Sequence, residues 1–271
     1  MADLTCISLG AGVQSTTLYL MACLGEIEPR PDVAIFADTG AEPREVLAHL
    51  WRLAENFGHI IPIRVVSGGD LEADCLGATR GERSRFASAP FRVRGPDGRP
   101  AMLRRQCTRE YKIEPINREL RALLGLAKGE RAAGFVTVEQ WLGISLDEAQ
   151  RMKPAQEKWI TTRWPLIEKR MTRRDCLAWL ERYDQPTPPK SACYFCPFHD
   201  NATWRRMRDT QPDLWARAVR FDAEIRRGKL NGVESDAFVH GSLLPLDQAP
   251  INGDDRQLNL FNNECEGMCG V

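Results

Sequence analysis

Along the first part of the chain, short apolar runs alternate with segments whose apolar residues recur at helical spacing. The apolar runs predict strands and the periodic segments predict helices. The predicted order is strand 4–9, helix 15–24, strand 33–37, helix 43–57 and strand 60–66. Strands and helices that alternate through short connections favour a parallel sheet wrapped by helices. Right-handed crossovers would place the loops after the first two strands on the carboxyl edge of that sheet, where ligands bind in such folds.

The rest of the chain predicts further helices and one more strand. Thr172, followed three residues later by Asp175, forms an approximate capping box at the start of a helix. The predicted elements are helix 113–126, strand 136–144, short helix 147–152, and helices 173–182, 201–208 and 212–227. We therefore predict an α/β fold with a parallel twisted sheet, helices on both of its faces and a helical C-terminal region. The predicted divisions are an α/β domain over residues 1–185, a Cys-x-x-Cys and helical region packed on it over 186–245, and a flexible cysteine-containing tail over 246–271.

Residues 80–109 interrupt this pattern with an excess of arginine. The segment carries nine arginines against two acidic residues, and residues 95–98 read Gly-Pro-Asp-Gly, which is a turn signal. One interpretation is a solvated, mobile loop. We favour a lid or funnel for a polyanion, such as a nucleotide or a nucleic-acid backbone, because the segment contrasts with the rest of the chain.

Composition narrows the classes of protein to consider. The 271 residues include 37 basic and 37 acidic side chains, so the formal net charge is zero. This balance argues against a protein that mainly coats nucleic acid, because such binding depends on phosphate neutralisation. No apolar run has the length of a membrane span, and the N-terminus lacks the pattern of a signal peptide. We therefore expect a cytoplasmic protein with no membrane contact.

Nine cysteines are informative in a reducing compartment, where clustered cysteines indicate metal ligands or catalytic thiols. Four of them lie singly in apolar segments and are interpreted as small buried side chains, namely Cys6, Cys23, Cys75 and Cys176. The other five lie in polar, turn-like or paired contexts, namely Cys107, Cys193, Cys196, Cys265 and Cys269.

The sequence Cys193-x-x-Cys196-Pro197 is a turn in which two thiolates can point at one metal ion. The nearby cations Arg109, Lys112 and Lys190 would favour thiolates. From these residues alone, zinc and an iron–sulfur cluster are equally suitable, and a redox-active pair is a third alternative. His199 is interpreted as a histidine at a helix start rather than a ligand.

Residues 8–16, Ser-Leu-Gly-Ala-Gly-Val-Gln-Ser-Thr, join the first predicted strand to the first predicted helix. A glycine-rich turn in that place presents backbone N–H groups and a helix N-terminus to an anion. No lysine precedes Ser15, so this is not a Walker loop, and Ser15 stands where a dinucleotide fingerprint has its third glycine. A plain tight turn is the alternative.

Taken together, these motifs resemble the adenine nucleotide α-hydrolase (PP-loop) superfamily, in the branch that contains phosphoadenylylsulfate (PAPS) reductases. The family loop reads Ser-Gly-Gly-Lys-Asp-Ser, of which only Gly12 and Ser15 match strictly. The similar segments, which span about residues 4–200, are 38–42 (Asp-Thr-Gly-Ala-Glu), 106–108 with Lys112 and Pro115, 143–145 with Glu148 and Arg151, 164–167, 172–180 and 191–197. The terminal Glu264-Cys265 is similar to the reductase tail.

The resemblance implies site residues. It assigns binding of ATP or another adenylyl nucleotide to Ser8, Gly10, Ala11, Gly12, Gln14, Ser15, Thr16, Asp38, Thr39, Gly143 and Arg151. It assigns catalysis to Cys265, Lys112 and Arg109, and a [4Fe-4S] cluster to Cys107, Cys193, Cys196 and Cys269. The roles of the two tail cysteines are interchangeable, or one iron stays open and binds exogenous sulfide. A magnesium ion and a homodimer are also compatible with it.

The resemblance also implies an activity. The favoured one is an iron–sulfur-dependent adenine nucleotide α hydrolase of the ATP pyrophosphatase type, acting in sulfur transfer. It would adenylate an acceptor, which would be a nucleic acid if the arginine-rich segment docks one. One alternative is a sulfonucleotide reductase in which Cys265 attacks the sulfate sulfur. Another is a non-catalytic nucleotide- or zinc-binding partner in a larger complex.

Overall fold

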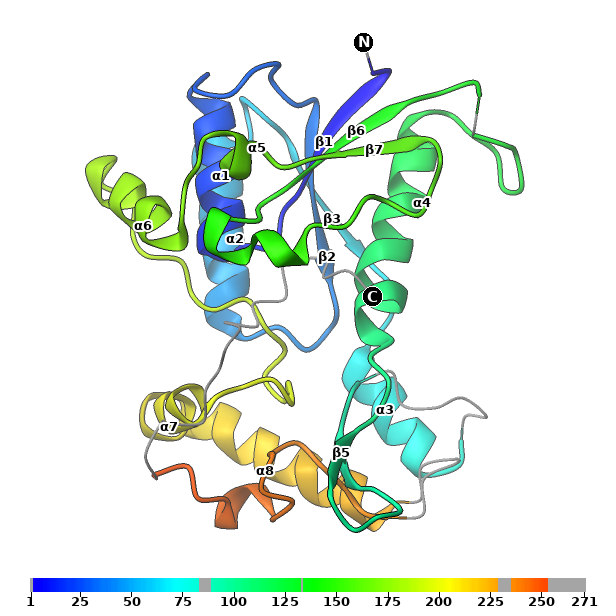
Figure 1. Ribbon diagram of the computed structural model, residues 1–271, viewed down its shortest axis with the longest axis vertical. Helices are drawn as coiled ribbons and strands as arrows, with labels where there is room; N and C mark the ends of the chain where they lie inside the picture. Colours follow the sequence, from blue (N-terminus) through cyan, green and yellow to red (C-terminus); the bar gives the residue numbers. More distant parts are fainter. Residues whose placement is uncertain (1, 83–88, 133, 229–234, 253–271) are drawn as a thin grey trace.

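The computed structural model describes residues 2–82, 89–132, 134–228 and 235–252 and contains a five-stranded parallel sheet (Figure 1). The strand order is β3-β2-β1-β6-β7. The strands are β1 (Leu4–Ser8), β2 (Val33–Asp38), β3 (Ile63–Ser67), β6 (Val138–Leu142) and β7 (Ile160–Arg163). The predicted α/β class with a parallel sheet is confirmed.

Both faces of this sheet are buried, as alternate residues of β2 show. Ala34 and Phe36 face a core shared with α1 (Val13–Cys23), α2 (Arg44–Phe57) and α6 (Arg173–Arg182). Val33, Ile35 and Ala37 face the opposite core, which is shared with α4 (Glu114–Leu123). Successive side chains of a strand point to opposite faces, and a strand covered on both faces needs an apolar residue at nearly every position. The continuous apolar run of β2 meets that requirement.

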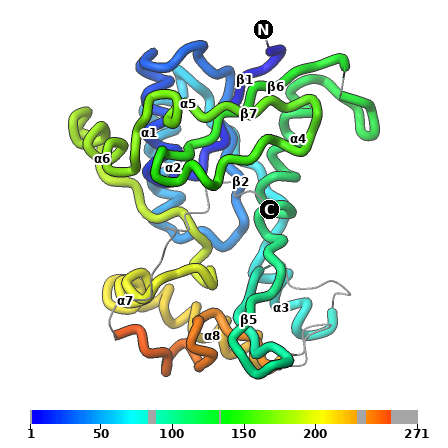
Figure 2. Tube along the Cα trace, viewed as in Figure 1, coloured from blue at the N-terminus to red at the C-terminus, as the bar shows by residue number. Residues whose placement is uncertain are grey.

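A second core lies beyond the carboxyl edge of the sheet (Figures 1 and 2). Its elements are α3 (Leu71–Thr79), α7 (Asn201–Thr210), α8 (Pro212–Arg227), the strands β4 (Arg92–Arg94), β5 (Pro100–Met102) and β8 (Ala237–Phe238), and the 3-10 turn η3 (Leu246–Gln248). The three strands form an antiparallel sheet in the order β5-β4-β8. The predicted domain boundaries at 185 and 245 stay predictions.

Part of the arginine-rich segment belongs to this second core. The turn signal at residues 95–98 connects β4 to β5, so the segment contains an ordered hairpin, and Arg94 Nη1 donates to the carbonyl of Gly98 at 3.0 Å. Arg80 pairs with Glu224 on α8 at 2.6 Å, and Arg92 donates to the carbonyl of Pro197 at 3.4 Å. These arginines thus make bonds within the second unit, while residues 83–88 lie outside the described part of the chain.

Local signals predicted several elements closely, and others were missed. The capping box is present, since Thr172 N donates to Asp175 Oδ2 at 2.8 Å, and α6 has the predicted bounds. The third strand begins at Ile63 rather than at residue 60. Helix α3 and strand β7 were not predicted. An N-cap signal was available for α3, because Asp70 accepts a hydrogen bond from Ala73 N.

The remaining helical segments are short or follow turns. They are η1 (Arg109–Ile113), a π-helical turn that continues into α4, η2 (Leu146–Arg151), a 3-10 helix, and α5 (Pro165–Glu168). Of the helices in the described ranges, none combines the length and the apolar character that crossing a membrane requires.

Candidate functional site

Two loops meet where the strand order of the parallel sheet reverses. The chain leaves β1 toward β2 on one side, whereas β6 pairs with β1 on the other side, so the switch point lies between β1 and β6. The glycine loop follows β1, and Gly143 follows β6. A Cβ atom added to Gly143 would lie 2.7 Å from both N and Cα of Ser15, so only glycine fits at that contact. Ligands bind at such switch points in parallel α/β sheets.

Helix α1 directs its N-terminus at this switch point. It begins at Val13, directly after the loop, and Ser15 and Thr16 lie in its first turn. The N–H groups of a first helical turn have no acceptor within the helix and carry a positive partial charge. Ala11 has a φ of 57°, in the left-handed region, and is fully buried. The arrangement suits an anionic ligand such as a phosphate.

The loop hydroxyls are held by side chains from neighbouring elements and, for Ser15, by the backbone of the loop itself. Ser8 Oγ accepts from Gln140 Nε2 at 2.8 Å, and Ser15 Oγ accepts from Gly12 N at 3.3 Å. His49 Nε2 lies 3.0 Å from Thr16 Oγ1, and Arg52 Nη2 lies 2.8 Å from the other ring nitrogen, Nδ1.

These contacts determine the protonation of His49. A guanidinium can only donate, so Nδ1 must accept from Arg52, and Nε2 then carries the ring proton and donates it to Thr16. Burial lowers the pKa of His49 to about 4, and the adjacent Arg52 contributes in the same direction. The neutral imidazole therefore leaves the Thr16 hydroxyl hydrogen able to point elsewhere, including toward a bound phosphate.

Gln14 connects the loop to two other segments. Arg173 Nη1, at the start of α6, donates to Gln14 Oε1 at 2.8 Å. Gln14 Nε2 donates to Glu148 Oε2 at 3.1 Å, and Arg151 Nη1 donates to Glu148 Oε1 at 2.7 Å. Two arginines and one glutamate thus lie around Gln14. The sequence indicated Arg151 but not Arg173, because nothing in the local pattern around Arg173 connects it to a loop 159 residues earlier in the chain.

The end of β2 connects the switch-point edge to the Cys-x-x-Cys turn. Asp38 Oδ1 accepts from Gly40 N at 2.8 Å and shapes the turn that follows the strand. The buried Thr39 hydroxyl donates to Glu42 Oε1 at 3.3 Å and lies 3.3 Å from Cys193 Sγ. Thr39, which was predicted to bind nucleotide, therefore contacts a predicted metal ligand.

Cys107, Cys193 and Cys196 line one small cavity. Cys196 N donates to the carbonyl of Cys193 at 2.9 Å, which closes the turn. The two residues between the cysteines are buried, and the ring of Phe195 stacks on Phe221 with centroids 4.0 Å apart. The second core thus anchors the turn and fixes where its thiols lie.

The electrostatics of this cavity differ from the expectation that nearby cations favour thiolates. Burial raises the pKa of the Cys193 thiol well above 9.0, and the Glu42 carboxylate raises it further. Lys112 opposes this rise but is itself engaged by Glu42, with Nζ and Oε1 3.5 Å apart and both side chains at least 95% buried. In the absence of a metal ion, Cys193 is therefore a neutral thiol.

The cysteines that line this cavity have the donor type of an iron–sulfur cluster, which takes four such ligands where three are present here. Their arrangement is not that of an assembled site, since the described residues contain no group of three or more His, Cys, Asp or Glu side chains that could hold a metal ion. The predicted residues Cys265 and Cys269 lie outside the described part of the chain. The ring of His199 packs edge-on against Trp204, and burial lowers its pKa to about 3, as befits a neutral packed histidine.

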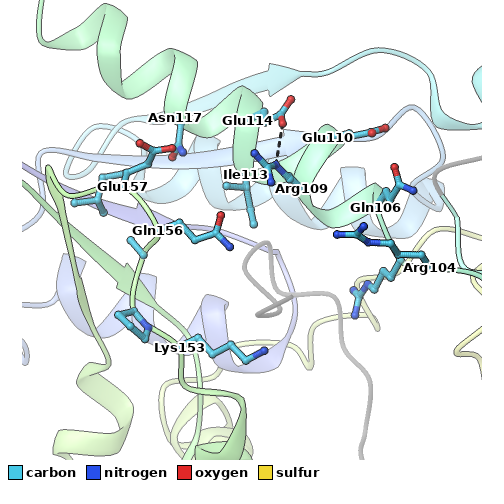
Figure 3. A pocket seen from close by; sticks show the side chains of 14 residues that line it. Arg104, Gln106, Arg109, Glu110, Ile113, Glu114, Asn117, Lys153, Gln156 and Glu157 are labelled. Carbon is cyan, nitrogen blue, oxygen red and sulfur yellow. Dashed lines mark hydrogen bonds and ion pairs between the residues drawn. The ribbon is translucent and has the colours of Figure 1, made fainter. Parts of the chain in front are cut away.

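A larger cavity of about 490 Å³ lies between the η1–α4 segment and the connection from η2 to β7 (Figure 3). Arg104, Gln106 and Arg109 line one wall, with Asn117 of α4 further along it. Lys153, Gln156 and Glu157 line the opposite wall. Of these residues, the sequence predicted a role for Arg109 but for none on the opposite wall, because residues 153–157 match no motif and no periodic pattern.

Comparison with solved structures finds a similar fold in phosphoadenylyl-sulfate (PAPS) reductase from Candida auris, described as a phosphate complex. The two chains are 14% identical, and the match covers 69% of this chain and 76% of the reductase chain with a TM-score of 0.43. The likeness lies in the arrangement of helices and strands. No family model and no curated protein matches the sequence.

Proposed function

We propose that this protein is an adenine nucleotide α hydrolase that cleaves ATP between the α and β phosphates and acts in sulfur transfer. The observation that carries the proposal is the contact of Gly143 with Ser15 at the switch point, directly against the N-terminus of α1. Backbone donors, loop hydroxyls and the arginines around Gln14 all gather at this contact. Such a set suits a nucleotide polyphosphate.

The chemistry assigned to this site is transfer of an adenylyl group. An acceptor oxygen attacks the α-phosphorus, the bond from that phosphorus to the bridging oxygen breaks, and pyrophosphate leaves. Positioning and charge stabilisation supply most of the catalysis in phosphoryl-type transfers. The Thr16 hydroxyl, oriented by His49, and the guanidinium of Arg173 would bind phosphate oxygens during this step.

The cysteine cavity is the proposed place of sulfur chemistry. Cys107, Cys193 and Cys196 would hold an iron–sulfur cluster, with a fourth ligand from the tail or from exogenous sulfide. When bound, the cluster would supply sulfur or electrons at the end of β2. Lys112, which is almost completely buried and opposes the rise of the Cys193 pKa, would offset part of the negative charge of metal-bound thiolates, while Glu42 pairs with it. A magnesium ion, a homodimer and a cytosolic location remain predictions.

The nucleotide activity is tested by incubating the protein, purified without air, with ATP and separating the products. AMP and pyrophosphate support the proposal. Thioredoxin-dependent release of sulfite from PAPS would replace it with a sulfonucleotide reductase, and ATP that is bound but intact would replace it with a non-catalytic partner. Arg173→Ala should weaken ATP binding by about tenfold, the usual worth of one charge-assisted hydrogen bond. Arg174→Ala, at the exposed neighbouring position, is the matched control.

The cluster is tested by iron and sulfide analysis of serine variants. Cys107→Ser, Cys193→Ser and Cys196→Ser should each lose most of the bound iron and the associated absorption. Cys75→Ser is the control, because Cys75 is fully buried in the second core and does not line the cysteine cavity. Stoichiometric zinc in colourless protein, or unchanged iron in Cys107→Ser, would refute the cluster.

A further inference from the structure

We propose that the cavity of about 490 Å³ binds one nucleotide unit of the acceptor, with its base near Asn117 and its phosphate near Arg104. This inference rests on the proposed function only in calling the ligand the acceptor; the evidence for the site itself is the cavity and its lining residues. Its volume lies within the range of small-ligand sites, about 300–1,000 Å³. The lining residues belong to segments 104–117 and 153–160, whereas the ATP loop follows β1.

A buried amide oxygen marks the base end of the cavity. Asn117 Oδ1 is inaccessible to solvent and has no hydrogen-bond partner among the described residues. A buried acceptor without a donor is unfavourable, so such an atom in a cavity wall indicates a ligand that donates to it. Gln156 projects from the opposite wall, and Glu157 lies at the same end as Asn117 (Figure 3). Two amides and a carboxylate are suited to the exocyclic amine and ring nitrogens of a nucleobase.

Cationic side chains mark the other end. Arg104 and Gln106 lie together away from Asn117, and Lys153 extends from the facing connection (Figure 3). Arg109 donates from Nε to Glu114 Oε1 at 3.2 Å, which uses one of the five N–H donors of its guanidinium. Guanidinium groups bind phosphate oxygens with bidentate geometry.

The balance of charges selects the class of ligand. Four cations line the cavity, Arg104, Arg105, Arg109 and Lys153, together with three acids, Glu110, Glu114 and Glu157. A lining with this near-neutral balance does not favour a polyphosphate, which carries several negative charges. It suits a ligand with one phosphate and a hydrogen-bonding base.

The position of the cavity explains why its ligand would be the acceptor. Arg105 lines both this cavity and the cysteine cavity, and its guanidinium lies over the ring of Phe198 at 5.2 Å from the centroid. A nucleotide bound here would therefore lie beside Cys107 and the Cys-x-x-Cys turn. The phosphate end of the nucleotide, near Arg104 and Arg105, is therefore the end that adjoins the site at which sulfur would be supplied.

The test measures binding of the four nucleoside 5′-monophosphates and of a five-nucleotide single-stranded RNA by calorimetry, with saturating α,β-methylene-ATP present. Asn117→Leu and Arg104→Ala should each raise Kd by about fivefold to tenfold, the usual worth of one hydrogen bond to a neutral or charged partner. Arg104→Ala should also reduce the salt dependence of RNA binding by about one phosphate contact. Arg99→Ala is the matched control, because Arg99 belongs to the same segment, is 86% exposed and does not line the cavity.

The outcomes distinguish failure of the nucleotide site from failure of the proposed ATP-cleaving function. Unchanged affinity in Asn117→Leu and Arg104→Ala, or displacement of the nucleotide by the ATP analogue, would overturn the site. Tighter binding of the RNA than of the monophosphates identifies the acceptor as a nucleic acid, and equal affinities identify it as a free nucleotide. Conversion of ATP to AMP is measured separately in the same variants. Nucleotide binding without that conversion keeps the site and refutes the proposed function. Circular dichroism excludes misfolded variants.

Discussion

Protonation of His49 should destabilise the protein, because the native contacts require its neutral ring. Nδ1 accepts a hydrogen bond from Arg52, and a proton on that atom would remove the bond and place two cations in contact. His49 is only 7% exposed, so water cannot compensate. The pKa of His49 is accordingly lowered from 6.5 to about 4. The unfolded chain therefore binds more protons than the native protein between these two values.

The sign and size of the effect follow from that difference. The contribution of His49 to the free energy of unfolding is complete above pH 6.5 and is lost as the pH falls from 6.5 to about 4. One unit of pKa corresponds to about 1.4 kcal/mol, so the full loss is about 3 kcal/mol. Between pH 7 and pH 5 the expected loss is about 2 kcal/mol. That is a large share of the stability of a typical domain.

Urea denaturation followed by tryptophan fluorescence at pH 7 and pH 5 measures this loss, and His49→Gln is the comparison. The variant cannot titrate at this position, so its free energy of unfolding should fall by about 2 kcal/mol less than that of the wild type over the same pH range. His199 and His240, whose pKa values burial also lowers, contribute to both proteins alike. Equal losses in the two proteins would show that His49 is not held neutral by its surroundings.

Three further substitutions test how the core supports the site. Gly143→Ala should lower the free energy of unfolding by about 1–3 kcal/mol and weaken ATP binding, because its Cβ would meet the backbone of Ser15; unchanged ATP affinity in calorimetry would contradict the loop contact. Asp222→Ala should cost about 3–5 kcal/mol in urea denaturation, because the buried carboxylate accepts from two backbone N–H groups and from Arg226. Thr172→Ala should cost about 1 kcal/mol, a loss that would be absent if the capping box did not stabilise α6.

The arginine-rich segment shows what composition can and cannot predict about a binding site. Nine arginines against two acids indicated a site for a polyanion, and two of them, Arg104 and Arg109, line the cavity of about 490 Å³, whose lining as a whole is close to neutral. The same excess could not reveal that Arg80 pairs with Glu224 across the second core. A count of charges does not show which residues pair when the partners are far apart in the chain. It also does not distinguish an arginine that forms an internal ion pair from one that binds a ligand.

The candidate site shows a similar division. Adjacent residues predicted the glycine loop and the Cys-x-x-Cys turn, because both depend on the local backbone. The bond from Arg173 to Gln14 was not predictable, since four further strands of the parallel sheet, β2, β3, β6 and β7, lie between the loop and α6 in the chain. The same holds for Asn117, whose chemistry depends on a cavity wall built by residues 153–160.

The order of the first three strands and of the two helices between them, the start of α6 and the carboxyl-edge position of the first loop followed from the amino-acid sequence, because they depend on periodicity, capping and the handedness of crossovers. Tertiary structure alone decided that Cys107 lies with Cys193 and Cys196, and that Thr39 contacts Cys193. Those positions depend on how the second core packs beyond the sheet. Packing is set by contacts between residues far apart in the chain, which no local pattern records.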